Sequence, residues 1–512
     1  MMAAQQLAAK QLGDLIGETD LGAPLGTTVA AIEISGLRLD SRLVEAGDLF
    51  LACAGSLMDG RDFIEQAVER GAAAVLAECD EKWQRNNIYQ GVPVIVVDGL
   101  PQKLSAIAGR FYNHPSAKLP LVGVTGTNGK TSCSHLLMQL MNRFRKSCGV
   151  IGTLGVGVDG LFDSGINTTP DAVAIQKDIA EWQQNNIDLV AMEVSSHGLE
   201  QGRVAALAFD QAIFTNLSRD HLDYHGTMES YGDAKARLFQ MPGLKVAIIN
   251  GDDPFSQQLL AQLPQSVTAY VYSICRERAC VPSVNVWVDD ICYHDNGVNA
   301  QLHSPWGDFT LSSPLLGAFN LSNVVAVIIA AVNLGLPIAA VVEAVATLKT
   351  VAGRMERLPS STGINAVVDY AHTPDALEHA LQAVRQHTQG KLWCVFGCGG
   401  DRDQGKRPQM GEIAQRYADH VIVTSDNPRS ENPNDIINEI LGGIDRPTLV
   451  EEDRARAIDF AIQQAAVGDS VLVAGKGHED YQQIGAERIP YSDIKQVRLA
   501  LAARESAQGG EQ

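Results

Sequence analysis

A glycine-rich segment between an apolar run and a helical pattern limits most strongly what this chain can fold into. Residues 119–131 read L-P-L-V-G-V-T-G-T-N-G-K-T; the apolar half predicts a short buried strand, and residues 132–141 predict a helix. A turn of this kind aims backbone N–H groups and the helix N-terminus at one point, where phosphate binds. The segment therefore predicts a nucleoside triphosphate site, with Lys130 as a mobile cation and the Thr131 hydroxyl as a Mg²⁺ ligand.

The loop departs from the strict phosphate-loop pattern at one position. The pattern G-x-x-x-x-G-K-[ST] calls for glycine at position 124, where this chain has Val124, and Gly123 and Gly126 flank that position. A chance G-K-T in a surface turn is the alternative, and the strand before it and the amphipathic run after it argue against that interpretation. The expected phosphate contacts are Gly126, Thr127, Asn128, Gly129, Lys130 and Thr131.

Length and charge exclude several classes of protein. A chain of 512 residues suggests three domains at about 100–200 residues each. Its formal net charge of −20 disfavours nucleic acid and anionic membranes as partners. Apolar runs such as residues 324–332 are far shorter than the ~20 residues that cross a bilayer, and residues 1–20 lack a secretion signal. Nine cysteines without C-x-x-C spacing predict reduced, mostly buried thiols and a cytoplasmic protein.

Alternating strand and helix patterns predict an α/β fold in three parts. We expect a small N-terminal α/β domain (residues 1–113), a central parallel sheet with the phosphate loop (114–352) and a C-terminal Rossmann-like domain (353–512). Residues 284–312 alternate instead, as in a β-rich insertion. In the last part, polar residues and glycines follow several strands, where open α/β sheets bind ligands, so this domain should hold a ligand of its own.

An acidic residue follows the predicted strand at residues 187–192. Glu193 stands where folds with a phosphate loop often have a second Mg²⁺ ligand. The alternative is that this segment only starts a helix, with Ser195 or Ser196 as its N-cap, and both interpretations can hold together.

Two further candidates lie downstream. His221 belongs to residues 218–225, where ionisable side chains are unusually dense, although a solvated loop would also carry such charges. Lys235 falls in a predicted helix at residues 229–239, and the plain alternative for a helix lysine is a solvated side chain.

Six motifs, in chain order, resemble those of the Mur ligases, the ATP-dependent amide-forming enzymes of peptidoglycan precursor synthesis. They are T-G-T-N-G-K-T, E-V-S-S-H-G-L, N-L-S-R-D-H-L-D-Y-H, G-A-F-N-x-x-N, D-Y-A-H-T-P-D-A-L and D-N-P-R. The resemblance covers nearly the whole chain, and the shifted glycine is this family's own form of the loop.

The resemblance implies an enzyme that takes ATP and two further small molecules. The first domain would bind the UDP end of UDP-N-acetylmuramoyl-L-alanyl-D-glutamate, the second ATP with Mg²⁺, and the third meso-2,6-diaminopimelate. The γ-phosphate would pass to the D-glutamate side-chain carboxylate, and the amine of diaminopimelate would attack the acyl phosphate. This plan agrees with the chemistry, because a carboxylate is a poor electrophile until it is phosphorylated, and phosphoryl transfer needs positioned cations. We expect a monomer.

The resemblance also implies site residues. Contacts to UDP fall on Leu39, Ser41, Ser56, Leu57 and Met58. Those to the muramoyl peptide fall on Asn167, Thr168, Thr169, Ser195, Gln201 and Arg203. Asn320 and Arg354 would lie near the adenosine end of ATP, and Glu193 and His221 would serve Mg²⁺. Lys235 would carry a carbamate that helps to hold a second Mg²⁺. Diaminopimelate contacts fall on Arg402, Asp426, Asn427, Pro428, Arg429, Gly475 and Glu479. Lys130, Glu193, His221 and Lys235 form the implied catalytic set.

Two rival functions stay open at this point. Folylpolyglutamate synthase shares the ATP fold and the acyl-phosphate chemistry, but the D-N-P-R stretch and a domain before the ATP loop disfavour it. A non-enzymatic nucleotide switch explains the phosphate loop and leaves the polar strand ends of the third domain without a role.

Overall fold

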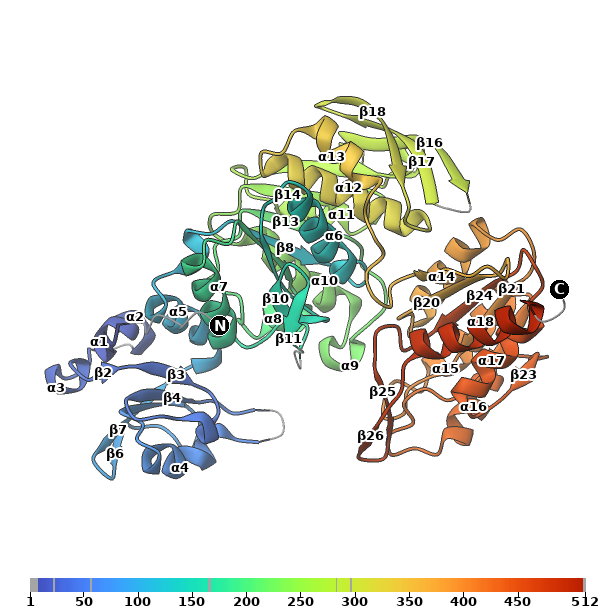
Figure 1. The fold of residues 1–512 in the computed structure, drawn as a ribbon. Helices are drawn as coiled ribbons and strands as arrows, with labels where there is room; N and C mark the ends of the chain where they lie inside the picture. The colour runs from blue at the N-terminus through green and yellow to red at the C-terminus, as the bar shows by residue number, and fades with distance from the viewer. Residues whose placement is uncertain are drawn as a thin grey trace.

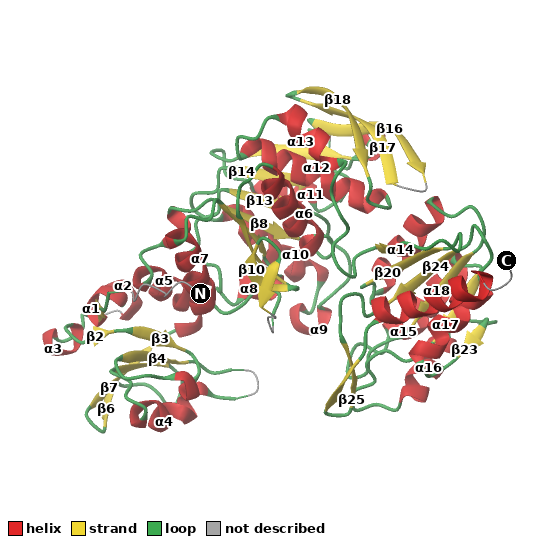
Figure 2. Ribbon diagram, viewed as in Figure 1, coloured by secondary structure: helices red, strands yellow, loops and turns green. Residues whose placement is uncertain are grey.

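The computed structural model describes residues 8–21, 24–55, 58–163, 167–281, 283–294 and 297–509. Three α/β bodies follow one another along the chain, each built around its own main sheet (Figure 1). Helices pack on these sheets in all three bodies (Figure 2). The prediction of a three-domain α/β protein is confirmed.

The N-terminal body has a five-stranded sheet in the order β3-β4-β5-β7-β6, parallel except at β6. Alternate residues of β4 face opposite sides, so that Leu49 and Leu51 pack beneath α5 while Phe50 and Ala52 pack with α4. The strands are β3 (Gly36–Arg38), β4 (Asp48–Ala52), β5 (Ala74–Glu78), β6 (Asn87–Tyr89) and β7 (Val92–Val97); the helices are α1 (Leu12–Leu15), α2 (Glu18–Leu21), α3 (Thr27–Ala30), α4 (Ile64–Glu69) and α5 (Leu100–Phe111); β1 (Lys10–Gln11) and β2 (Glu33–Ile34) pair separately.

The central body is built on an eleven-stranded sheet in the order β11-β10-β9-β12-β8-β13-β14-β15-β16-β17-β18. In this sheet order, all neighbouring strands from β9 through β12, β8, β13, β14 and β15 to β16 pair in parallel. Strand β8 therefore lies between β12 and β13. The strands are β8 (Leu121–Thr125), β9 (Cys148–Gly152), β10 (Gly155–Val158), β11 (Leu161–Asp163), β12 (Leu189–Glu193), β13 (Gln211–Phe214), β14 (Val246–Asn250), β15 (Thr268–Ser273), β16 (Val286–His294), β17 (Gly297–Ser304) and β18 (Gly307–Ser313). The helices are α6 (Lys130–Arg143), α7 (Ala172–Gln184), α8 (Ser196–Glu200), α9 (Leu222–His225), α10 (Met228–Ala236), α11 (Ser256–Gln262), α12 (Ala318–Asn333) and α13 (Ile338–Val345).

The β-rich stretch expected at residues 284–312 is present as the antiparallel strands β16, β17 and β18. Because β16 pairs in parallel with β15, this stretch extends the central sheet and does not form a separate unit. Helices α6 and α12 share one core with both parts of the sheet, since Leu136, Val325 and Leu302 belong to the same buried cluster.

The C-terminal body has a six-stranded sheet in the order β19-β20-β24-β21-β22-β23, parallel except at β19. Its strands are β19 (Glu356–Leu358), β20 (Asn365–Asp369), β21 (Leu392–Phe396), β22 (His420–Val423), β23 (Leu449–Val450) and β24 (Ser470–Ala474), and β25 (Tyr481–Ile484) with β26 (Glu487–Pro490) forms a hairpin. Its helices are α14 (Pro374–Gln386), α15 (Lys406–Tyr417), α16 (Pro433–Leu441), α17 (Arg454–Gln464) and α18 (Asp493–Gly509). The segments expected to bind a ligand follow β21, β22 and β24, which are neighbours in the sheet.

The N-terminal and central bodies are joined by a continuous apolar contact. Ala172 and Val173 at the start of α7 belong to the same buried cluster as Leu104 and Ile107 of α5. The Ser105 hydroxyl accepts a hydrogen bond of 3.0 Å from the backbone N–H of Ala206. We infer that helix α5 belongs to this junction as much as to its own sheet.

All nine cysteines are free, as expected. The expectation that most are buried is wrong: only Cys133, Cys148, Cys394 and Cys398 are, because these four lie in core elements of the central and C-terminal bodies. Within the described part of the chain, no helix is long and apolar enough to cross a membrane.

A buried ion pair stabilises the C-terminal body. Arg454 and Asp493 begin helices α17 and α18, both side chains are fully buried, and Arg454 Nε lies 2.7 Å from Asp493 Oδ1. Because Asp493→Ala would leave a buried guanidinium without its partner, we expect a loss of about 3–5 kcal/mol in the free energy of unfolding. Urea denaturation measures this. Glu412→Ala, which breaks an exposed ion pair with Arg416, is the matched control and should cost less than about 1 kcal/mol. An equal effect of both changes would contradict the assignment.

Candidate active site

The predicted phosphate loop joins β8 to α6, and its backbone requires glycine at two positions. Gly126 has φ +147° and Gly129 φ +88°. A Cβ atom on Gly126 would lie 1.9 Å from Thr215 Oγ1, and one on Gly129 would lie 2.6 Å from Asn323 Oδ1. The loop is therefore closely packed against Thr215, just after strand β13, and against Asn323 of helix α12.

Two N–H groups of this loop already have partners within the protein. Thr127 N donates to the backbone oxygen of Asn216, and Asn128 N donates to the Asn216 side-chain oxygen, both at 2.9 Å. We infer that Asn216, at the end of β13, sets the shape of the loop.

Lys130 lies folded over the loop that precedes it. Its Nζ donates to the backbone oxygens of Gly126 and Thr127, at 2.8 Å each. Burial lowers the pKa of Lys130, and nearby Glu193 and Asp220 act in the opposite direction. An amine held by two carbonyl groups beside the helix N-terminus is well placed to turn toward a bound phosphate.

Thr131 and Glu193 meet because their strands are neighbours. Strand β12 pairs with β8 in a register that sets Glu193 beside Val124. The Thr131 hydroxyl donates to Glu193 Oε2 at 2.9 Å, and Thr153 N donates to Glu193 Oε1 at 2.9 Å. Glu193 is fully buried. A hydroxyl and a carboxylate at the loop are the hard oxygen ligands that Mg²⁺ prefers, so these residues fit a magnesium ion. Ser195 caps α8 as well, so both interpretations of this segment hold.

Lys235 is almost completely buried, so the solvated alternative for this side chain is wrong. Its relative exposure is 1%, and its Nζ donates to Gly126 O at 2.9 Å and lies 4.3 Å from the centre of the Tyr231 ring. Burial lowers the pKa of Lys235 well below its usual value, and the neighbouring Lys130 adds to this. Two lysine amines thus share the Gly126 carbonyl, which favours the neutral form of Lys235.

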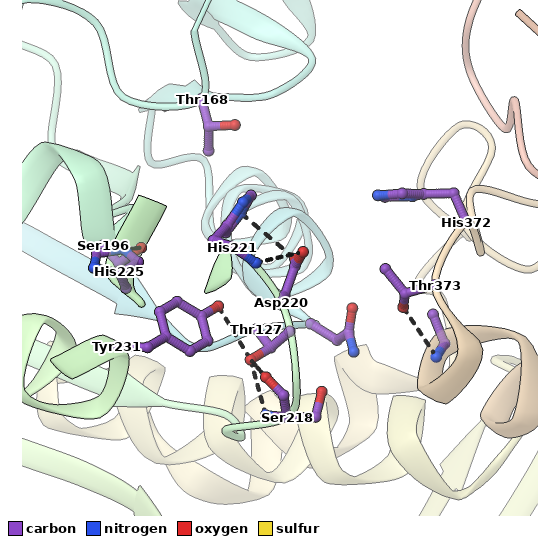
Figure 3. Close-up of polar contacts among 12 residues, drawn as sticks. Thr127, Thr168, Ser196, Ser218, Asp220, His221, His225, Tyr231, His372 and Thr373 are labelled. Carbon is purple, nitrogen blue, oxygen red and sulfur yellow. Dashed lines mark hydrogen bonds and ion pairs between the residues drawn. The ribbon is translucent and has the colours of Figure 1, made fainter. Parts of the chain in front are cut away.

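His221 lies at the end of the same site, in the left-handed conformation with φ +54°. The centre of its ring lies 4.9 Å from that of His197 and 6.1 Å from that of Tyr231. Figure 3 shows His221 beside Asp220. Partial burial lowers the pKa of His221, the neighbouring Asp220 carboxylate opposes this, and the positive charge of Lys130 adds to the lowering. Among the described residues, no group of three or more His, Cys, Asp or Glu side chains could hold a metal ion. The expected magnesium set differs from such a group because it includes a threonine and a lysine.

Most of the residues expected to contact the muramoyl peptide are linked by hydrogen bonds, and we call them the polar strip. Thr169 Oγ1 donates to Glu193 O and accepts from Ser195 N, at 2.9 Å each. Arg203 donates from NH1 to Thr169 O at 2.6 Å and from NH2 to Gln201 Oε1 at 2.6 Å. Nearby, the Thr168 and Thr153 hydroxyls are 3.1 Å apart, and Asn167 is exposed. The polar strip therefore runs from Glu193, which with Thr131 fits a magnesium ion, toward α8.

The residues expected at UDP lie at one edge of the N-terminal sheet. Leu39 and Ser41 follow β3, Met58 lies in the segment after β4, and the two strands are parallel neighbours. The Ser41 hydroxyl donates to Gln66 Oε1 at 2.6 Å, and Met58 is exposed. Ser56 and Leu57 lie outside the described residues.

Two residues expected near adenosine lie at different places. Arg354 comes from the chain that enters the C-terminal body, and its NH2 donates to Thr131 Oγ1 at 3.4 Å, which is the phosphate end of the site. Its guanidinium stacks 4.5 Å from the centre of the Tyr370 ring. Asn320 is buried in the first turn of α12, and its Nδ2 donates to Leu316 O at 2.9 Å.

The residues expected to bind diaminopimelate gather at the carboxyl ends of β21, β22 and β24. Arg402 and Arg429 flank Gly399, and Arg429 NH1 donates to Gly400 O at 2.6 Å. Asn427 Nδ2 donates to Glu479 Oε2 at 2.8 Å. Pro428 and Asp426 are buried within the same segment, and Gly475 has φ +121°. All seven residues thus come together in one region.

Sequence reasoning missed Lys476, and the structure brings two further residues, Asp375 and His372, to the active site. Lys476 is fully buried between Asn427 and Glu479. The sequence feature that could have identified it is a lysine between two glycines directly after a strand. Asp375 of the C-terminal body accepts from Ser218 at 2.8 Å and from Asn128 at 3.3 Å. His372 belongs to the same side of the site, opposite His221 (Figure 3).

Family models cover most of the chain in three consecutive segments. The Mur ligase family, catalytic domain matches residues 33–112; the Mur ligase middle domain matches residues 124–331; and the Mur ligase, glutamate ligase domain matches residues 353–477. Together with the phosphate loop and the three sheets, these matches define an ATP-dependent ligase built from three domains. The chain belongs to the Mur ligase family.

Two curated relatives of this chain carry the same name. The UDP-N-acetylmuramoyl-L-alanyl-D-glutamate–2,6-diaminopimelate ligases of Ectopseudomonas mendocina and Pseudomonas aeruginosa are 49% and 50% identical to this chain. The matches span 94% and 92% of this chain and 99% and 96% of the relatives. A solved structure of a protein with the same name is 36% identical, covers 97% of this chain and 99% of its own, and has a TM-score of 0.71. Folylpolyglutamate synthase of Mycobacterium tuberculosis, at 20% identity, 73% and 92% coverage and a TM-score of 0.60, shares the fold.

Proposed function

We propose that this chain joins meso-2,6-diaminopimelate to the D-glutamate of UDP-N-acetylmuramoyl-L-alanyl-D-glutamate, with ATP as the energy source. The observation that carries the proposal is that relatives 49–50% identical over nearly their whole length bear the name of this ligase. The Thr131–Glu193 pair and the cluster of Arg402, Arg429 and Glu479 support it. The reaction belongs to the cytoplasmic synthesis of peptidoglycan precursors, and we propose a monomer.

The ATP half of the site is formed by the loop and its neighbours. Residues 126–131 bind the phosphates, with Lys130 neutralising the charge that develops during phosphoryl transfer. Thr131 and Glu193 would hold Mg²⁺, which would supply further neutralisation of the phosphates, and His221 is proposed to serve the same ion. Arg354 reaches the Thr131 hydroxyl and therefore acts at the phosphate end, while Asn320 serves the adenosine end.

Lys235 is proposed to carry a carbamate. Its neutral amine forms a C–N bond with the carbon of CO₂ and one N–H proton is released. The buried neutral amine thereby becomes a carbamate anion, which would serve as an oxygen ligand for a second Mg²⁺. The lowered pKa of Lys235 favours this reaction, because only the unprotonated amine is a nucleophile.

The acyl-phosphate reaction then proceeds between the three bodies. The polar strip holds the D-glutamate carboxylate near the γ-phosphate, and phosphoryl transfer makes the carboxyl carbon electrophilic. The amine of diaminopimelate attacks this carbon, a C–N bond forms, inorganic phosphate leaves, and the amine loses a proton. The UDP end rests at the sheet edge formed by Leu39, Ser41 and Met58.

Acceptor dependence separates this proposal from a nucleotide switch. Phosphate release from ATP should require both the UDP-linked peptide and diaminopimelate, because an acyl phosphate without an amine returns to ATP or stays bound. Phosphate release that is the same without any amine acceptor would favour the switch. Activity with glutamate and a folate in place of these substrates would favour a folylpolyglutamate synthase.

The preference for diaminopimelate over L-lysine is expected to depend on Arg429. L-lysine has the same terminal amine but lacks the distal carboxylate, and Arg429 offers a planar fork for that group. Because each charged hydrogen bond contributes about 1.5–3 kcal/mol, Arg429→Ala should lower the diaminopimelate-to-lysine ratio of kcat/KM by roughly 10- to 100-fold. Competition assays measure this ratio, and Arg416→Ala, on the exposed face of α15, is the control. An unchanged ratio would place the selectivity elsewhere.

A further inference from the structure

We infer that Lys476 is a positioning residue of the amino-acid site, which keeps the Glu479 carboxylate ionised and fixes the direction of the Asn427 amide. This inference rests on the proposed function, because it assigns these residues to the zwitterionic distal end of diaminopimelate. Lys476 itself is buried behind Asn427 and Glu479 and acts through them.

The geometry places one buried cation among three oxygen acceptors. Lys476 Nζ donates to Asn427 Oδ1 at 2.8 Å and to Glu479 Oε2 at 3.3 Å, and it lies 3.9 Å from Asp426 Oδ1. A fully buried ammonium is stable only where such partners surround it. The backbone that delivers it needs glycine on both sides, since Gly475 and Gly477 have φ +121° and +52°. A Cβ on Gly475 would lie 2.6 Å from Asp426 Oδ2.

The Asn427 amide has only one possible orientation. Its Oδ1 also accepts from the backbone N–H of Gln483 at 2.8 Å, so both neighbours of this oxygen are donors. The Nδ2 group must therefore face Glu479. Gln483 belongs to β25, and its backbone oxygen accepts a hydrogen bond of 3.1 Å from Arg429 N. Lys476 thus contributes to a connection between the hairpin, Asn427 and Arg429.

The charges around Glu479 explain why a cation is needed there. Burial raises the pKa of Glu479, the charge of Asp426 adds to this, and Lys476 opposes both. The other groups that face this cluster are Tyr370 after β20, Tyr481 on β25 and, beside Asp426, the buried Arg454. Two carboxylates and one ammonium leave a negative pole, whereas Arg402 and Arg429 form a positive pole. This separation matches the ammonium and carboxylate of one amino-acid end.

Steady-state kinetics of Lys476→Met and Lys476→Gln test the inference. Lys476→Met should raise the KM for diaminopimelate about 10- to 100-fold at pH 7, and should change the KM values for ATP and the UDP substrate less than about twofold. Lys476→Gln keeps a donor for Asn427 and loses the charge, so its effect should be smaller. Lys495→Met, at an exposed position on α18, is the control and should behave as wild type.

The pH dependence distinguishes positioning from a general structural role. Without Lys476 the pKa of Glu479 should lie higher, because burial and the charge of Asp426 are then unopposed. The ratio of the diaminopimelate KM of Lys476→Met to that of wild type should therefore fall as the pH rises, because Glu479 ionises at a higher pH in the variant. In Lys476→Met combined with Glu479→Gln, the ratio should not depend on pH.

Several results would overturn the inference. The first is a diaminopimelate KM of Lys476→Met within about twofold of wild type. The second is an equal increase in the KM values of all three substrates. The third is a ratio of variant to wild-type diaminopimelate KM that does not change with pH in Lys476→Met. If Lys476→Met does not fold, the same pH test on Lys476→Gln decides, because charge loss alone predicts the effect. A wild-type enzyme that forms no diaminopimelate product would refute the proposed function first, so the two failures are distinguishable.

Discussion

Replacing Lys130 with alanine is expected to lower kcat by at least about 10²-fold while the fold stays intact. Lys130 Nζ is held by two loop carbonyl groups, at 2.8 Å each, beside the start of α6. From there it can neutralise charge on the β- and γ-phosphates in a site shielded from water, where one such group contributes several kcal/mol. The measurement is ligation rate at saturating substrates.

The control for this change is Lys118→Ala, which removes an exposed lysine shortly before β8. Both variants should unfold at temperatures close to that of the wild type, because Lys130 contacts only its own loop among the hydrogen bonds described. If Lys130→Ala kept more than about a tenth of wild-type activity, the assignment of this loop to ATP would be wrong.

Lys235→Ala should be nearly inactive for a different reason. The variant lacks the buried amine beside Gly126 O and hence the anion that the proposed carbamate supplies to Mg²⁺. A small carboxylic acid, such as formate or acetate, should enter the space left by the side chain and restore part of the activity. ¹³C NMR of the wild type with ¹³CO₂ should show one carbamate signal that Lys235→Ala lacks.

The pH behaviour of the carbamate follows from the lowered pKa of Lys235. An exposed lysine is protonated at pH 7 and reacts poorly with CO₂, whereas a buried amine with a lowered pKa stays neutral at lower pH. The carbamate signal should therefore persist at a lower pH than it would on an exposed lysine. An experimental substrate-bound structure with a bare ammonium at Lys235 and no metal near it would count against this proposal.

Local patterns in the sequence were enough to predict the strand–loop–helix around Lys130 and the position of Glu193 beside it. The phosphate loop is a contiguous strand–turn–helix signal, and Glu193 follows from the rule that ligands bind at the carboxyl ends of parallel strands. The caps of α8 and α14 at Ser195 and Thr373 are equally local. Such features depend on residues only a few positions apart.

Long-range contacts could not be predicted in this way. Arg354 donates a hydrogen bond to Thr131, 223 positions away in the sequence, and therefore lies beside the phosphate loop. The resemblance in sequence suggests a position near the adenosine end of ATP. Lys476 and Lys130 each follow a glycine in the sequence, yet one is fully buried in an ion-pair cluster and the other lies on the phosphate loop. Burial of this kind depends on which strands become neighbours, and the sequence pattern alone does not specify strand order.

Mass spectrometry of the reaction product tests the central claim most directly. The chain is incubated with UDP-N-acetylmuramoyl-L-alanyl-D-glutamate, ATP, Mg²⁺ and an equimolar mixture of amino acids that includes meso-2,6-diaminopimelate and L-lysine. We expect a single new species whose mass equals that of the UDP substrate plus diaminopimelate minus one water, with formation of ADP and phosphate. A lysine adduct as the main product, or ATP hydrolysis without any adduct, would contradict the proposed function.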